Sequence, residues 1–303
     1  YFGTSDEKEC NVMYNASMMV LLWNSLATRD VRLMERSLSI DNGVPDDGVW
    51  INYARCHDDI GWGFEENIIR ELGLDPEKHK QFIIRFMEGK FPGSFAIGEL
   101  YEFNPVTLDA RNSGTMASMC GLEQAVNEKH RYKIELAVKR ILLLNSIVIS
   151  YTGIPLLYSG DEIGQLNDWE YKKDPAIAHD SRWLHRGKMN WDAAAEREDV
   201  RTIPGQIFTE IRRMLDIRKG NSVFFSALKS VPVEMGNPAV FGFHKGDKLM
   251  VLANFSEREQ WADTKYFDWF GLPGEMEDLL SGRRVKTWNN QILLGPYGVL
   301  WLA

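Results

Sequence analysis

Residues 49–62 read VWINYARCHDDIGW, and this stretch decides the kind of fold that we expect. Its first half alternates β-prone residues with smaller ones, a pattern that predicts a short strand. His57, Asp58 and Asp59 follow the strand, before Gly61 breaks the chain. In α/β folds, ligand sites lie at the carboxyl ends of strands, so an imidazole and two carboxylates there form a candidate site. Alternatively, the three residues cap the next segment, since Asp commonly starts helices and turns.

The residues before this stretch predict a strand and then a helix. Residues 10–15 are β-prone, and residues 16–38 carry apolar side chains at near-helical spacing. Residues 41–48 contain Asp, Gly and Pro in a pattern typical of turns, which ends the helix before the next strand begins. The order of strand, helix and strand favours a parallel sheet with right-handed connections.

A second helix and strand are predicted later in the chain. Residues 129–149 form a helix with a broad apolar face, and residues 152–158 (TGIPLLY) form a strand. Asp161 and Glu162 follow that strand. In a parallel sheet these carboxylates would lie on the same rim as Asp58.

Two long segments lie between or beyond these elements. Residues 63–127 exceed the roughly dozen residues that a crossover needs, so we expect an inserted subdomain that serves the site. Residues 163–202 concentrate tryptophan beside Asp, Arg and His. Aromatic faces next to charged groups suit a polyhydroxylated ligand, although packing of the long loop onto the fold is an alternative explanation.

Beyond residue 222 the apolar pattern changes to a period of two, with short runs separated by Gly and Asn, which predicts a small antiparallel domain. A helix beginning near Pro204 precedes it. The predicted fold class is therefore α/β with an inserted subdomain and a C-terminal antiparallel region. The predicted segments are residues 1–62, 63–127, 128–221 and 222–303.

Composition limits the classes of function. The 303 residues are 44% hydrophobic, and 43 acidic against 35 basic residues give a net charge of -8, which argues against nucleic acid or an anionic membrane as the main partner. Three widely spaced cysteines suggest neither a disulfide framework nor a zinc site, so we expect no metal or cofactor and a cytoplasmic location. Because the chain starts at Tyr1 without Met, we expect it to be a piece of a longer protein.

Seven pieces of the sequence, taken together, resemble glycoside hydrolase family 13, the α-amylase family, and among its members the amylosucrases. HDDIGW and GDEIGQLND are the most specific of them. The pieces are YNASMMVLLWNSLATRDV, INYARCHDDIGWGF, FPGSF, FNPVTLDARNSGT, YTGIPLLYSGDEIGQLND, HDSRWLHR and GPYGVLWL. The resemblance implies strands six to eight of a (β/α)₈ TIM barrel, a B′-like insertion over residues 63–127 and a C-terminal β-sandwich.

The resemblance also implies roles for individual residues. Asp58 would stabilise the transition state, and His57 and Asp59 would bind the sugar together with Arg182 and Arg111. The implied parent is a retaining glucosyltransferase or hydrolase acting on sucrose and α-glucan. In the amylosucrase pattern the partner of Arg182 is an acidic residue from an early barrel loop, which would leave Arg182 unpaired in this chain.

The resemblance places the nucleophile and the acid/base on strands four and five, ahead of HDD. Glu99 in FAIGEL is a poor substitute for the acid because it follows HDD. Retaining glycosidases need both carboxyl groups, so this chain alone is expected to be inactive, with the missing N-terminal half as a possible partner. Two alternatives stay open: another α-amylase-family glycosidase, such as a sucrose hydrolase or an α-amylase, and a carbohydrate-binding relative that lacks the catalytic carboxylates.

Overall fold

A computed structural model describes residues 7, 9–40, 48–225, 228–272 and 274–303. The turns predicted over 41–47 lie outside these residues. The chain divides into two compact units. Unit 1 comprises Tyr1–Tyr53, Leu143–Leu156 and Arg212–Ala303, and unit 2 comprises Ala54–Leu142 and Leu157–Ile211.

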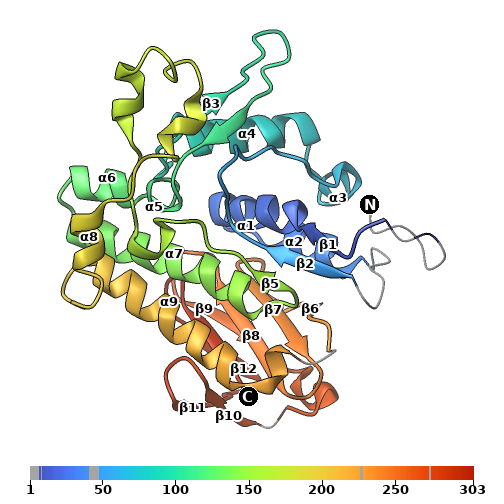
Figure 1. The fold of residues 1–303 in the computed structure, drawn as a ribbon. Helices are drawn as coiled ribbons and strands as arrows, with labels where there is room; N and C mark the ends of the chain where they lie inside the picture. Colours follow the sequence, from blue (N-terminus) through green and yellow to red (C-terminus); the bar gives the residue numbers. More distant parts are fainter. Residues whose placement is uncertain (1–6, 8, 41–47, 226–227, 273) are drawn as a thin grey trace. The chain divides into compact units, whose positions relative to one another are not determined.

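Unit 1 contains the predicted parallel sheet. Its three strands, in the order β1-β2-β5, are β1 (Val12–Tyr14), β2 (Val49–Asn52) and β5 (Ile154–Pro155). Both pairings are parallel, which confirms that prediction (Figure 1). β5 is shorter than the predicted strand over 152–158. Gly153 adopts a left-handed φ of 135° just before it, and Pro155 has no N–H to donate to a neighbour.

The single helix predicted over 16–38 is wrong, because two helices occupy this region. Helix α1 (Ala16–Thr28) begins at Asn15, whose side chain accepts a hydrogen bond from the Met18 amide, and α2 (Arg32–Ser39) follows. Between them Arg29 takes a left-handed conformation with φ of 59°. That conformation ends an α-helix, and the apolar spacing of the sequence gave no sign of it.

The C-terminal part of unit 1 is an antiparallel sheet, as predicted. Six strands lie in the order β11-β10-β13-β8-β7-β6, and β12 pairs with β9 in a separate ribbon (Figure 1, orange to red). The bounds are β6 Val231–Val233, β7 Val240–Lys245, β8 Leu249–Asn254, β9 Gln260–Asp263, β10 Glu275–Asp278, β11 Arg283–Lys286, β12 Gln291–Leu294 and β13 Val299–Leu302.

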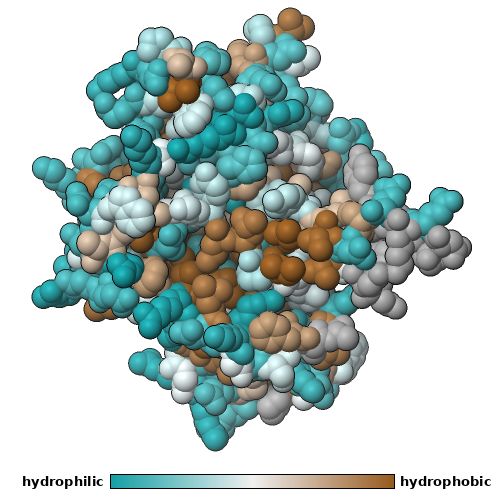
Figure 2. Space-filling view, viewed as in Figure 1, coloured by the Kyte–Doolittle hydropathy of each residue, from teal (hydrophilic) through white to brown (hydrophobic). Residues whose placement is uncertain are grey.

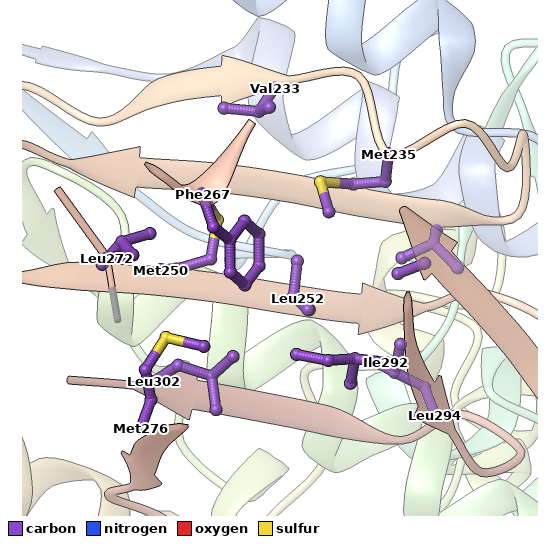
Figure 3. Packing of buried hydrophobic residues seen from close by; sticks show 12 residues of the cluster. Val233, Met235, Met250, Leu252, Phe267, Leu272, Met276, Ile292, Leu294 and Leu302 are labelled. Carbon is purple, nitrogen blue, oxygen red and sulfur yellow. The ribbon is translucent and has the colours of Figure 1, made fainter. Parts of the chain in front are cut away.

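The antiparallel strands surround a hydrophobic core of their own. Met250 and Leu252 of β8 and Leu302 of β13 are fully buried, and Phe267 packs with them. Figure 3 shows these side chains pointing toward one another, with Ile292 of the ribbon beside them. Because apolar residues at every second position face one interior, the period of two in the sequence predicts this core correctly.

The parallel sheet is less well covered than the antiparallel one. Val12 and Tyr14 of β1 and Ile154 of β5 are each about half exposed. In Figure 2, part of the hydrophobic area at the centre of the visible face lies over β1 and β2. The outer strands of the parallel sheet have no further strand beside them among the described residues.

Unit 2 contains short helices and one β-hairpin. Helix α4 (Pro76–Glu88) begins at Asp75, which accepts from the Lys78 amide, and strands β3 (Glu99–Tyr101) and β4 (Arg111–Ser113) pair antiparallel. The other helices are α3 Glu66–Glu71, α5 Met116–Met119, α6 Leu122–Asn127 and α8 Trp191–Ala195, and the 3₁₀ turns are η1 Asp161–Ile163, η2 Trp169–Lys173 and η3 Ser181–Leu184.

Helices α7 (Arg131–Ser150) and α9 (Ile203–Gly220) agree with the helices predicted from residues 129 and 204. The turn η4 (Ser222–Phe224) follows α9, and η5 (Phe267–Phe270) precedes β10. The structure is therefore mixed α/β with a C-terminal antiparallel sheet. The boundaries of the four predicted segments stay a prediction.

Candidate functional site

The HDD segment of unit 2 is held to the β3–β4 hairpin by backbone hydrogen bonds. Ile60 and Asn112 form an antiparallel bridge, in which the Ile60 amide donates to the Asn112 carbonyl over 2.8 Å. The Trp62 indole N–H donates to Asn112 Oδ1 over 2.8 Å. The hairpin belongs to the segment predicted as a subdomain that serves the site, and these bonds attach it to residues directly after Asp59.

Arg182 links Asp58 to the DSRW turn. Asp180 caps η3 by accepting from the Arg182 amide, and its carboxylate also accepts from the Arg182 guanidinium at 2.9 Å. Arg182 Nη1 donates to Asp58 Oδ1 over 3.1 Å, and the guanidinium stacks over the Tyr101 ring. The expectation that Arg182 is unpaired in this chain is wrong, because Asp180 and Asp58 are both its partners.

Asp59 faces a second arginine, from strand β4. Arg111 Nη1 lies 3.5 Å from an Asp59 carboxylate oxygen and 3.3 Å from Glu102. The Asp59 side chain is 6% exposed, whereas that of Arg111 is 51% exposed. The structure therefore brings Asp58, Asp59, Arg182 and Arg111 into one cluster, as their assignment to a common site requires.

The two neighbouring carboxyl groups have opposite pKa shifts. Burial favours the neutral form of both, but hydrogen bonds from Asp59 and Arg182 outweigh it at Asp58 and bring the Asp58 pKa down to about 2. At Asp59, burial and the adjacent Asp58 charge raise the pKa to about 6, against the attraction of Arg111. The geometry supports this division because Arg182 contacts Asp58. Asp58 is thus a half-exposed carboxylate whose lowered pKa keeps it ionised near neutral pH.

Asp161, predicted on the same rim as Asp58, lies in the interior of unit 2. It forms an ion pair of 2.8 Å with Arg55, and both side chains are 2% exposed. The Arg55 guanidinium also stacks over the Tyr158 ring. Glu162 accepts from the Gly160 amide, which holds the turn itself. Asp161 therefore supports the scaffold at Arg55, three residues before Asp58, and is shielded from solvent. Glu162 supports its own turn.

Glu99 is engaged elsewhere in unit 2. Its carboxylate accepts from the Tyr171 hydroxyl and from Lys172, both in η2. Of the loop tryptophans, Trp169 donates its indole N–H to Glu123, while Trp191 is largely exposed. Trp169 thus has a structural bond, and a sugar platform formed by these tryptophans stays a prediction.

Two residues of the charged, tryptophan-rich loop, to which the sequence analysis gave no individual role, contact the HDD backbone. His185 and Arg186 both bond to the carbonyl oxygen of His57. The only signal for them is their place in HDSRWLHR, three and four residues after Arg182. The His57 side chain itself is exposed.

The described residues contain no group of three or more His, Cys, Asp or Glu side chains placed to hold a metal ion. Within the same part of the chain, every helix is too short or too polar to cross a membrane.

Comparisons with known proteins place the chain beside α-amylase-family enzymes. It is 22% identical over its whole length to glucosylglycerate phosphorylase of Escherichia coli K12 and 23% identical to trehalose synthase of Thermus thermophilus. The chain spans 50% of the former and 30% of the latter. No protein-family model matches the chain.

Solved structures share the fold. The crystal structure of AmyP in complex with maltose superposes with a TM-score of 0.60 at 13% identity, covering 99% of this chain and 51% of AmyP. The relatives and structural neighbours are α-amylase-family enzymes, and the mixed α/β fold matches the C-terminal part of such enzymes. The resemblance to this wider family is thus supported by the relatives and by the fold.

Proposed function

We propose that this chain is the C-terminal part of a retaining enzyme that transfers or hydrolyses α-linked glucosyl units, with Asp58 as the carboxylate that stabilises the transition state. The observation that carries the proposal is the state of Asp58: half exposed, ionised, and fixed by Arg182 at 3.1 Å. A glucosyl ring that develops oxocarbenium character gains most from a fixed negative charge of this kind.

The neighbouring residues take supporting roles in the proposal. His57 is exposed and available for a sugar hydroxyl, and Arg111 and Arg182 supply further donors. The Asp59 amide donates to Asp58 Oδ1 over 3.0 Å and so helps to hold that carboxylate. The nucleophile and the acid/base would come from another part of the complete protein, which carries the first strands of a (β/α)₈ barrel. Strands β1, β2 and β5 would then be its last three.

For the substrate, we propose sucrose as glucosyl donor and an α-glucan as product, as in amylosucrase. The support is the sequence of the HDDIGW and DSRW pieces, which resemble that group. The neighbour AmyP binds maltose, which supports an α-glucan ligand at a fold of this type.

A second candidate is transfer of the glucosyl unit to phosphate. Glucosylglycerate phosphorylase is similar over the whole chain, and Arg111, Arg182 and Arg186 place three guanidinium groups around Asp58 and Asp59. Planar guanidinium groups bind phosphate well, so an anionic acceptor is compatible with this charge.

The test uses the complete protein that carries this chain. It is incubated with sucrose and with maltoheptaose, each with and without inorganic phosphate. Sucrose should release fructose or glucose and yield α-glucan. Glucose 1-phosphate in the phosphate arms would favour the second candidate. Asp58→Asn is the matched control and should lose the activity. A complete protein with no activity on any of these substrates would contradict both candidates, and the 303-residue chain alone should be inactive.

A further inference from the structure

We propose that His185 is a positioning residue that fixes the backbone of His57 and thereby the place of Asp58. No role in the site was assigned to it from the sequence. The contacts that fix the His57 backbone all lie within unit 2. The effect of this backbone on catalysis by Asp58 rests on the proposed function.

The two ring nitrogens of His185 bond to backbone groups on two different segments. Nδ1 lies 3.1 Å from the Gly114 amide nitrogen, and Nε2 lies 3.1 Å from the His57 carbonyl oxygen. An amide N–H only donates and a carbonyl only accepts, so Nδ1 must accept and Nε2 must donate. A single state of the ring, the neutral Nε2–H tautomer, satisfies both bonds. The Nδ1–H tautomer and the protonated imidazolium would each place an Nδ1–H donor against the Gly114 N–H donor. The Nδ1–H tautomer would also place an Nε2 acceptor against the His57 carbonyl oxygen.

The surroundings keep the ring neutral. His185 is 4% exposed, and burial is the main cause that lowers its pKa to about 3. The positive charges of Arg55 and Arg186 lower the pKa further, while the bond to the His57 carbonyl and the Asp58 charge oppose them. Protonation would have to add a hydrogen at Nδ1, where the Gly114 N–H already points.

The Gly114 side of this contact is tightly packed. A Cβ built on Gly114 would lie 2.8 Å from Met119 Cγ, so any larger residue there would force the Met119 side chain to shift. Gly114 directly follows β4, and the adjacent Thr115 amide donates to Asn167 Oδ1 over 2.8 Å. The imidazole is therefore anchored to backbone that is itself held.

A second donor supports the same carbonyl. Arg186 Nε lies 2.6 Å from the His57 oxygen, so His185 and Arg186 occupy both of its lone pairs. Both donors directly follow η3, which also carries Arg182. Turn η3 thus holds the Asp58 carboxylate through Arg182. The two residues after η3 hold the peptide group between His57 and Asp58.

Two substitutions separate the two bonds. His185→Gln can keep an N–H near the Nε2 position and so the bond to His57. His185→Asn can keep an acceptor near the Nδ1 position, and it loses the bond to His57. In the complete protein with its best glucosyl donor, we expect His185→Asn to lower kcat by roughly 10- to 100-fold with little change in KM. His185→Gln should retain most of kcat. His130→Gln, an exposed histidine before α7, is the control.

The result that overturns the proposal is equal kcat for the two His185 variants at matched folded fraction, whether both are reduced or both unchanged. A purely structural role predicts that kcat per folded molecule stays constant, and thermal unfolding measured in parallel gives that fraction.

A readout without activity separates this inference from the proposed function. Histidine-selective ¹⁵N NMR of the complete protein, assigned by the loss of one signal in His185→Gln, should show the Nε2–H tautomer with no protonation between about pH 8 and 5. An Nδ1–H tautomer, or protonation in that range, overturns the proposal. If the protein acts on no glucosyl donor but the tautomer is as expected, the proposed function fails and the contact between His185 and the HDD backbone stands.

Discussion

Two of the arginine–aspartate pairs in unit 2 have nearly equal length but very different surroundings. Arg55 and Asp161 are 2.8 Å apart and each 2% exposed. Arg182 and Asp58 are 3.1 Å apart, but their side chains are 26% and 48% exposed. Distance alone would assign both pairs the same role, whereas burial separates them.

The difference shows which pair can act on a ligand. Removing a buried charge from water costs several kcal/mol, so each member of the Arg55 pair depends on the other. Burial even raises the Asp161 pKa to about 6, although Arg55 attracts the ionised form. Exposed pairs contribute only about 0–1 kcal/mol to stability. Asp58 therefore adds little to stability, but it is accessible and stays charged.

The largest effect is expected from breaking the buried pair. Asp161→Ala leaves the Arg55 guanidinium buried without its carboxylate, which should lower the free energy of unfolding by about 3–5 kcal/mol. Urea denaturation followed by circular dichroism measures this. The double variant Arg55→Met with Asp161→Leu is the control and should regain most of the loss, because apolar groups of similar volume need no partner. A loss below about 1 kcal/mol for Asp161→Ala would mean that the pair is solvated, contrary to its burial.

Breaking the more exposed pair, Arg182 with Asp58, should affect activity strongly and stability only slightly. Arg182→Ala in the complete protein should lower kcat/KM on sucrose by about 10- to 1000-fold, or about 1.4 to 4 kcal/mol of transition-state binding. Its unfolding free energy should change by no more than about 1 kcal/mol.

Arg182→Lys is the matched variant for this experiment. It keeps the charge but cannot bond to Asp180 and Asp58 at once through a rigid fork, so its activity should be intermediate. Full activity in Arg182→Ala would remove Arg182 from the site, and a large loss of stability would mean that the pair behaves like the buried one.

Much of the fold could be predicted from the sequence where periodicity is long and regular. Helix α7 agrees with its prediction within two residues at each end, and the antiparallel sheet follows the period of two. The break between α1 and α2 could not be predicted, because Arg29 is not a residue that usually marks a left-handed turn.

The candidate site could be located but its bonds could not. HDD stands out because charge follows a β-prone run. The partner of Asp58, however, is 124 residues away in the chain, and the positive residue opposite Asp59 comes from a hairpin inside the inserted segment. For Asp161, the position after a strand is visible in the sequence, and the resemblance implies a structural role for its turn, but its ion pair with the buried Arg55 depends on packing.

The smallest expected effect concerns Asp59, which is nearly as buried as Asp161 yet adjacent to the exposed Asp58. Its pKa is raised from 3.8 to about 6. Between these values the folded protein holds a proton that the unfolded chain releases, so the contribution of Asp59 to stability falls as the pH rises through this window. Asp59→Asn imitates the protonated form and still donates toward Asp58.

Asp59→Asn should therefore be more stable than the unsubstituted protein by ~1 kcal/mol at about pH 8, where an ionised Asp59 is repelled by Asp58, and equal to it at about pH 4. Urea unfolding at the two pH values gives the difference. Asp58→Asn should behave in the opposite way, because the Asp58 pKa is lowered to about 2. Its ionised form contributes stability above pH 3.8 that is lost as the pH falls through about 2, so the substitution should destabilise at about pH 8. If Asp59→Asn instead destabilises equally at both pH values, Asp59 is ionised throughout, and the proton that distinguishes the two neighbouring carboxyl groups is absent.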